Sequence, residues 1–199
     1  MNRLLIATNN KGKVKELQDL LKNTGIQIVT PTQINLILEV EEDGKNYAEN
    51  AGKKAIAFAK ASGLISLADD SGLEVDALEN APGLYSARYF PKPGATDADR
   101  RAFLLQNLKD KPRPWKAHFH ATIAIAQPGG EVEFAEGNCF GEIIPTERGN
   151  DGFGYDPIFL FPELNNTMAE LGMEHKNRLS HRALAVMNAM PVLERLFGV

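Results

Sequence analysis

The sequence predicts an α/β fold built on a mixed β-sheet. Short apolar runs typical of buried strands alternate with segments of helical period, a pattern that favours parallel strands joined by helices. Residues 115–126 and 131–140 have strand character, and the Pro-Gly-Gly turn at residues 128–130 joins them as an antiparallel hairpin. The chain has no internal repeat, and its 199 residues suffice for one domain, residues 1–199, with a sizeable core. We therefore expect both strand directions in one sheet.

The first part of the chain is predicted as strand, loop, helix and strand. We expect a strand at residues 3–7, followed by a loop of turn-forming residues at 8–12. A helix follows, because apolar residues recur at helical spacing, and Gly25 is expected to stop it. The next strand is expected at residues 26–29, before Pro31 breaks the chain. The apolar face of this helix consists of Val14, Leu17, Leu20 and Leu21.

An alanine-rich helix and an apolar strand are predicted next. The helix covers residues 47–62, with Gly63 as its stop, and its small side chains let it lie close to a sheet. The strand covers residues 64–68 and has the continuous apolarity of a buried parallel strand. We expect it to end there and to place Asp69 and Asp70 at its carboxyl end.

Two further helices and a short strand are predicted in the second half. Thr96 is expected to cap a helix that runs through Asp110, and Ser180 to cap a C-terminal helix. Residues 157–161 form an apolar strand. Pro191 lies within the last helix and is expected to kink or restart it, because proline lacks a backbone N–H. The side chains of the first helix expected to face inward are Phe103, Leu104 and Leu108, and the C-terminal helix bears Leu184, Met187 and Leu196.

Charge and composition exclude several classes of function. A formal charge of −4 and a pI near 5.6 do not suit binding to nucleic acid or to an anionic membrane. The single cysteine, Cys139, cannot form an intramolecular disulfide, and the 4 histidines offer little for a zinc site. No stretch approaches the roughly 20 apolar residues of a membrane span, and the first apolar run is too short for a signal peptide. We expect a cytoplasmic protein.

The loop after the first strand is a candidate anion site. It places a hydroxyl, two amides and cations at a predicted helix N-terminus, where backbone N–H groups and the helix dipole favour phosphate. The alternative, that these residues cap the helix while the lysines are solvated, is equally good. A Walker A motif is excluded, because Gly12-Lys13 is followed by Val14. The candidate residues are Thr8, Asn9, Asn10, Lys11, Gly12 and Lys13.

Two acidic segments make a candidate Mg²⁺ site. Adjacent carboxylates such as Asp69 and Asp70 repel one another unless a cation or hydrogen bonds compensate. Mg²⁺ takes one or two protein carboxylates together with waters and phosphates, and Glu41 or Glu42 could supply the second. Spacing does not decide between these glutamates. Lys54 could reach the same cluster; taken singly, each residue could also cap a turn or lie solvated on the surface.

An aromatic loop and a basic group complete the candidates. Phe153 and Tyr155 lie in the glycine-rich segment 149–156, where their rings could stack on a flat ligand or anchor the core. Cations in the first turn of the last helix oppose its dipole, which favours an anionic neighbour or a functional use. The basic group consists of Lys176, Arg178, His181 and Arg182.

These motifs, taken in order, resemble the inosine triphosphate pyrophosphatase family. They are LLIATNNKGKVKEL, EEDGKNYAENAGKKA, ADDSGLEVDAL, PGLYSARY, GFGYDPIF and LSHRALA, and they span nearly the whole chain. The resemblance implies a long twisted mixed β-sheet flanked by helices, with two lobes, a nucleotide in a central cleft, and a homodimer. It also implies Mg²⁺-dependent hydrolysis of non-standard purine nucleoside triphosphates (dITP, ITP and XTP) to the monophosphate and pyrophosphate.

The resemblance further implies roles for single residues. Asp70 is similar to the family's catalytic carboxylate, with Asp69 beside it, and Glu41 or Glu42 should hold Mg²⁺ together with Asp70. The implied triphosphate contacts are Thr8, Asn10 and Lys13. By the same resemblance, Ser71 should contact the substrate. The loop that stacks on the base is Phe153, Gly154, Tyr155 and Asp156, and the group that recognises the base is Lys176, His181 and Arg182. Departures from the family's pattern are Asp151, Arg100 and Arg101.

Two other functions are compatible with parts of the sequence. A pyrophosphatase of related fold could act on modified pyrimidine nucleotides, and a binding module could sense a nucleotide without turnover. The pair of aspartates disfavours the second, because a protein that only binds a triphosphate gains little from additional carboxylates.

Overall fold

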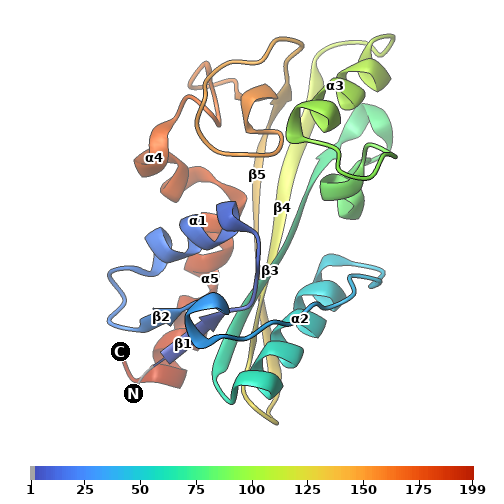
Figure 1. Cartoon of the computed structure of the whole chain (residues 1–199). Helices are drawn as coiled ribbons and strands as arrows, with labels where there is room; N and C mark the ends of the chain where they lie inside the picture. The colour runs from blue at the N-terminus through green and yellow to red at the C-terminus, as the bar shows by residue number, and fades with distance from the viewer. Residues whose placement is uncertain (1–2) are drawn as a thin grey trace. The chain divides into compact units, whose positions relative to one another are not determined.

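The structure is a computed structural model that describes residues 3–199 (Figure 1). Within these residues, seven strands form one sheet in the order β2-β1-β3-β4-β5-β6-β7. β1 pairs in parallel with β2 and β3, whereas β6 pairs antiparallel with β5 and β7, so the predicted mixed sheet is confirmed. The strands are β1 (Arg3–Ile6), β2 (Gln27–Val29), β3 (Ile65–Val75), β4 (Trp115–Ala126), β5 (Val132–Ile143), β6 (Phe159–Phe161) and β7 (Asn166–Thr167).

Most of the predicted helices form where the sequence placed them. Asn46 caps α2 and Gly63 ends it in the left-handed conformation, at the predicted boundaries. Thr96 caps α3, which ends at Leu108, two residues before the predicted end. The α-helices are α1 (Lys11–Leu21), α2 (Tyr47–Ser62), α3 (Asp97–Leu108), α4 (Gly172–Leu179) and α5 (His181–Phe197), and 3₁₀ turns lie at Thr32–Ile34, Asp76–Leu78, Gly83–Arg88 and Asp156–Ile158.

The chain divides into two compact units. Unit 1 comprises the described residues up to Asp70 together with Ala121–Gly137 and His181–Val199. Helices cover both faces of its part of the sheet (Figure 1). On one face, α1 and α5 pack over a core that includes Leu4 and Leu67. On the other, the small residues of α2 pack over Leu5, as the alanine-rich pattern predicts.

Unit 2 comprises Ser71–His120 and Asn138–Ser180. Its core joins the inner face of α3 to strand residues such as Phe119 and Phe159, whose ring centres are 4.8 Å apart. β3, β4 and β5 each contribute residues to both units, because each strand runs past a unit boundary.

The structure corrects the prediction for the strand that carries the two aspartates. β3 does not end at Ala68 but continues to Val75, so Asp69 and Asp70 lie within the strand rather than beyond its carboxyl end. An ion pair with Arg182 neutralises the Asp69 carboxylate inside the protein. The strand can therefore continue through a charged pair that would otherwise favour a turn.

Other boundaries also differ from the predictions. Residues 157–158 belong to a 3₁₀ turn, and β6 begins only at Phe159. The helix α4 has no counterpart among the predicted elements. α1 ends at Leu21, four residues before the predicted stop at Gly25. α5 runs through Pro191 without restarting; the carbonyl that loses its hydrogen-bond donor there belongs to Met187, whose exposed side chain indicates that water can reach it.

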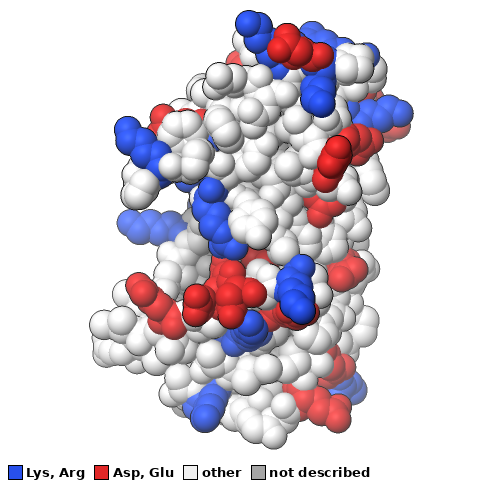
Figure 2. Space-filling view, turned by 90° about the vertical axis from the view of Figure 1, so that its right-hand side faces the viewer, with Lys and Arg blue, Asp and Glu red and all other residues white. Residues whose placement is uncertain are grey.

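Two features of the structure concern binding to nucleic acid and insertion into a membrane. Lys and Arg side chains are scattered among Asp and Glu side chains on the face in Figure 2. Within residues 3–199, no helix combines the length and apolarity that crossing a membrane would require.

Candidate functional site

The loop after β1 leads into the N-terminus of α1. Asn10 Oδ1 accepts a hydrogen bond from the Lys13 N–H at 3.1 Å, and Thr8 Oγ1 accepts one from the Asn10 N–H at 3.2 Å. Asn9 and Lys11 are exposed. The first turn of α1 holds no acidic residue, so nothing within the helix offsets the positive end of its dipole. The loop is therefore a helix cap and also an exposed electropositive helix end.

Lys13 extends from α1 toward β3 rather than into solvent. Its Nζ lies 2.9 Å from Asp69 Oδ2 and 3.3 Å from the Asp69 carbonyl oxygen. Burial lowers the pKa of Lys13, and the attraction of Asp69 offsets only part of this effect. The preceding residue, Gly12, is half-buried. Lys13 is thus a largely desolvated cation beside the aspartates of β3.

Asp69 is fully buried among cations. Arg182 donates to Asp69 Oδ2 from Nε at 3.2 Å and from Nη2 at 2.9 Å, and it also forms an ion pair with buried Glu16. Burial alone would raise the pKa of Asp69, but the charges of Arg182 and Lys13 outweigh it and hold that pKa far below its usual range. Asp69 is therefore an ionised anchor and not a proton acceptor near neutral pH.

Asp70 lies in a different environment. Its Oδ2 accepts a hydrogen bond from Asn50 Nδ2 at 3.1 Å, and its Oδ1 lies 3.5 Å from Lys54 Nζ. Burial raises the pKa of Asp70 more than the charges of Lys54 and Lys13 lower it. Successive strand residues point to opposite faces of a sheet, so the two neighbouring aspartates meet different partners. Of the two, Asp70 is the better proton acceptor.

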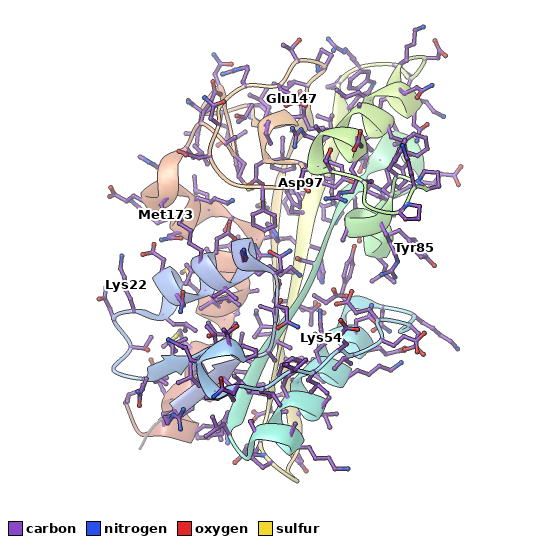
Figure 3. The ribbon with its side chains drawn as sticks, viewed as in Figure 1. Lys22, Lys54, Tyr85, Asp97, Glu147 and Met173 are labelled. Carbon is purple, nitrogen blue, oxygen red and sulfur yellow. The ribbon has the colours of Figure 1, made fainter. Side chains whose placement is uncertain are left out.

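Lys54 links Asp70 to the acidic segment before α2. From its position on α2 (Figure 3), its Nζ reaches Glu42 Oε1 at 2.6 Å and the Asp69 carbonyl oxygen at 2.9 Å. Burial alone would lower the pKa of Lys54, but Asp70 and Glu42 outweigh it and raise that pKa. Lys54 reaches the acidic cluster, as the sequence predicted.

Glu42 and Asp70 are the carboxylates whose chemistry fits Mg²⁺. Both approach Lys54 Nζ, at 2.6 and 3.5 Å, so the two carboxylates converge, whereas Glu41 is exposed. Mg²⁺ prefers carboxylate oxygens and keeps several waters, so two protein ligands are enough. Within residues 3–199, no cluster of three or more His, Cys, Asp or Glu side chains offers a closed metal cage. The donor set fits a metal that binds partly through substrate and water.

His181 and Arg182 form the first turn of α5, as predicted, and both are buried. Gly137 of β5 makes room for this turn. A methyl group at Gly137 would overlap the carbonyl oxygen of His181 and the backbone nitrogen of Ala185. Asp69 and Glu16 supply the anions that offset Arg182 at a helix N-terminus.

The remaining candidates belong to unit 2. Asp156 Oδ2 accepts hydrogen bonds from the Phe153 N–H at 2.9 Å and from Lys176 Nζ at 2.6 Å. The same ammonium lies 5.3 Å from the centre of the Phe153 ring. Tyr155 is buried, and its hydroxyl donates to the Ser86 carbonyl at 2.9 Å, so this ring anchors the core. Phe153 is half-buried and is the aromatic face that a ligand can use.

Gly154 lies between the two aromatic residues, and both its N–H and its carbonyl form hydrogen bonds to side chains. Its N–H donates to Asp97 Oδ2 at 2.8 Å, and its carbonyl accepts from Arg101 Nη1 at 2.8 Å. Both partners lie on α3, more than 50 residues earlier in the sequence, so no local motif could reveal these contacts. Ser71 is half-buried in β3.

Glu16 and Asn50 also contact the site, although neither is among the predicted site residues. Asn50 precedes Lys54 by four residues and therefore shares its helix face, a signal that could have identified it. Glu16 carried no such signal, because it contacts Arg182 166 residues away.

Comparison with known proteins decides the family. Residues 4–192 match the Ham1 family. The chain belongs to the Ham1 family. A relative from Desulforamulus reducens, named dITP/XTP pyrophosphatase, is 51% identical over 98% of this chain and 97% of its own. A relative of the same name from Desulfotalea psychrophila is 50% identical over 92% of this chain and 81% of its own.

Solved structures of Ham1 proteins share the fold. The protein from Staphylococcus aureus is 36% identical with a TM-score of 0.84 and covers 98% of this chain and 99% of its own. A Ham1 protein from Coxiella burnetii is 38% identical with a TM-score of 0.87, over 98% of this chain and 100% of its own. The family resemblance inferred from the motifs is confirmed, and so is the predicted α/β fold.

Proposed function

We propose that this Ham1 protein hydrolyses dITP, ITP and XTP to the nucleoside monophosphate and pyrophosphate, and so removes them from the cytoplasmic nucleotide pool. The observation that carries the proposal is the 50–51% sequence identity, over 92–98% of this chain, to relatives named dITP/XTP pyrophosphatase. The convergence of Glu42, Lys54 and Asp70 in unit 1 supports a hydrolase, because a protein that only binds anions does not need buried carboxylates. By its resemblance to the family, we also propose a homodimer.

The triphosphate is proposed to bind at the N-terminus of α1. Thr8 and Asn10 contribute polar side chains, and the neighbouring residues Asn9, Lys11 and Gly12 bring backbone N–H groups and charge to the same end of the helix. Lys13 lies between this loop and Asp69, so it can neutralise charge that develops on a phosphate oxygen. The electropositive end of α1 supports this assignment.

Glu42 and Asp70 are proposed to hold Mg²⁺. When bound, the ion supplies a Lewis acid that stabilises negative charge on phosphate oxygens. Lys54, which contacts both carboxylates, keeps them close together.

Asp70 is proposed to orient a water molecule for attack on the α-phosphorus and to accept its proton. Burial raises the pKa of Asp70 in the metal-free protein, whereas a bound Mg²⁺ would lower it, so the proposed role as a base rests on the position of the carboxylate. Asn50 holds the carboxylate in place through a hydrogen bond of 3.1 Å. Asp69, fixed by Arg182, keeps β3 and its backbone carbonyl in position for both lysines.

The purine is proposed to bind through Phe153 and Lys176 of unit 2. Phe153 offers a ring face, and Lys176 offers a donor to the 6-carbonyl of hypoxanthine or xanthine. Adenine carries an amino group there, which leaves buried donors unpaired at a cost of about 1–3 kcal/mol each. Arg182, committed to Asp69 and Glu16, is proposed to act on the site through Asp69.

Pyrophosphate release from a panel of nucleotides tests the function. With Mg²⁺, we expect ITP, dITP and XTP to be hydrolysed at least about tenfold more efficiently than ATP, since a buried unpaired donor costs about that factor or more. Preferential hydrolysis of dUTP or a methylated pyrimidine triphosphate would favour the pyrimidine alternative. Equal rates with ATP and ITP would refute the proposed purine contacts.

Asp70→Asn separates an enzyme from a nucleotide sensor. An enzyme should lose hydrolysis in this variant while ITP still binds at saturating Mg²⁺, because the amide keeps the shape and one oxygen ligand but cannot accept the proton. A sensor would show binding and no hydrolysis in the wild type.

A further inference from the structure

The aromatic loop of unit 2 is held by two residues of α3. Asp97 Oδ2 accepts a hydrogen bond from the Gly154 N–H, and Arg101 Nη1 donates one to the Gly154 carbonyl, both at 2.8 Å. Asp97 and Arg101 are four residues apart, so they share one face of the helix. The two contacts therefore fix the backbone on both sides of a single glycine.

Each of these side chains is itself oriented by a second ionic partner. Arg100 forms an ion pair with Asp97 Oδ1, which leaves Oδ2 directed at Gly154. Arg101 donates to both carboxylate oxygens of Glu147, at 2.8 and 2.9 Å. The side chains of Asp97 and Glu147 are drawn in Figure 3. A bidentate arginine–carboxylate pair restricts the guanidinium strongly, so its remaining N–H groups have a defined direction.

The loop needs such contacts because of its glycines. Gly152 and Gly154 have φ values of +82° and +60°, on either side of Phe153. Glycine in a loop has the largest conformational freedom of any residue, so the direction of the Phe153 ring is not set by the local backbone alone. The Phe153 N–H bond to Asp156 fixes one end of this segment, and the α3 contacts fix the other.

We propose that Asp97 and Arg101 are positioning residues that fix Gly154 and thereby hold the Phe153 ring ready to stack on the purine. The proposal rests on the proposed function, since it assigns the ring to the nucleobase. Both residues act through the backbone of Gly154, so the proposal assigns their effect to affinity for the base and not to the chemical step.

The first experiment compares Asp97→Ala with Asp97→Asn. The alanine variant leaves the Gly154 N–H without its acceptor, and we expect the KM for ITP to rise about 5- to 20-fold while kcat changes less than about twofold. Asp97→Asn keeps an oxygen acceptor and should recover most of the affinity. Gln106→Ala, on the exposed side of α3, is the matched control and should have the wild-type KM.

Two readouts distinguish positioning from a structural role. Inorganic tripolyphosphate has no base, so its inhibition constant should be the same for the wild type and Asp97→Ala. In a Phe153→Ala background, Asp97→Ala should raise the KM by less than about twofold, because coupled residues give non-additive effects in a double-mutant cycle.

The outcomes separate this proposal from the proposed function. A wild type that does not hydrolyse ITP refutes the function itself. A wild type that hydrolyses ITP, with an unchanged KM in Asp97→Ala or with the full effect retained in the Phe153→Ala background, overturns the positioning role alone. If Asp97→Ala melts more than a few degrees below the wild type, Arg101→Gln replaces it as the test variant. This variant removes the hydrogen bond to the Gly154 carbonyl, and the same rise in KM is expected.

Discussion

At the scale of single residues, the two aspartates of β3 illustrate how environment assigns different roles to identical side chains. Asp69 bonds Arg182 and Lys13, and its pKa is held far below the usual range despite burial. Asp70 is also buried, but weaker attraction leaves its pKa raised. The sequence identified both residues as a pair, yet it could not say which one titrates, because Arg182 lies 113 residues from Asp69.

Asp70→Asn should remove activity and increase stability. We expect kcat to fall about 10²- to 10⁴-fold with the loss of a general base. A carboxyl whose pKa is raised in the folded state destabilises that state above the unfolded pKa, near 4, so the variant should melt at a higher temperature than the wild type at pH 7. This difference should vanish as the pH falls below about 4. Thermal unfolding across this pH range checks the sign, and a variant less stable at pH 7 would contradict it.

Asp69→Asn should have the opposite effect on stability. The depressed pKa of Asp69 means that its ionised form stabilises the folded state above the unfolded pKa, and this contribution is lost as the pH falls below about 4. The variant leaves Arg182 and Lys13 without their shared anion, so we expect a loss of about 3–5 kcal/mol near pH 7. Denaturant unfolding measures it, with exposed Asp110→Asn as the neutral control. A loss below about 1 kcal/mol would show that the ion pairs contribute little.

At the scale of elements, local signals fixed helices better than strand ends. Asn46 and Gly63 bound α2, and Thr96 starts α3, because capping residues act through their nearest neighbours. The end of β3 was predicted wrongly because the ion pair that allows the strand to continue comes from α5. The contacts of α3 with the aromatic loop were likewise invisible in the sequence, since they join residues more than 50 positions apart.

The close packing of β5 against α5 at Gly137 predicts the effect of a substitution there. Gly137→Ala places a methyl group into the backbone of the first turn of α5, which carries His181 and Arg182. Because the neighbouring atoms are backbone and cannot rotate away, we expect a loss of about 1–3 kcal/mol in unfolding free energy and a lower kcat for ITP. Gly129→Ala, in the open turn between β4 and β5, meets no neighbouring atom and carries only the strain of its φ of +71°, so it measures that strain alone. A loss below about 1 kcal/mol in Gly137→Ala would show that the turn does not depend on this close packing.

At the scale of the whole molecule, the net charge is unfavourable for binding polyanions that carry no metal ion. The chain carries a formal charge of −4, and its basic side chains are scattered among acidic ones on the face in Figure 2. The charged cluster of unit 1 holds three cations, Lys13, Lys54 and Arg182, against four carboxylates, Glu16, Glu42, Asp69 and Asp70, which leaves −1 when all are ionised. Neither the molecule nor this group attracts a bare triphosphate strongly.

Removal of divalent cations should therefore weaken nucleotide binding itself and not only turnover. One Mg²⁺ would change the charge of the charged cluster from −1 to +1, so the affinity for a non-hydrolysable ITP analogue, measured by calorimetry, should fall at least about tenfold in EDTA and return with Mg²⁺. Glu42→Gln should raise the Mg²⁺ concentration needed for half-maximal binding, whereas exposed Glu41→Gln should leave it unchanged, because only Glu42 converges with Asp70 on Lys54. Equal affinity with and without Mg²⁺ would mean that the cations of α1, α2 and α5 suffice for the triphosphate, and the two carboxylates would then act only in the chemical step.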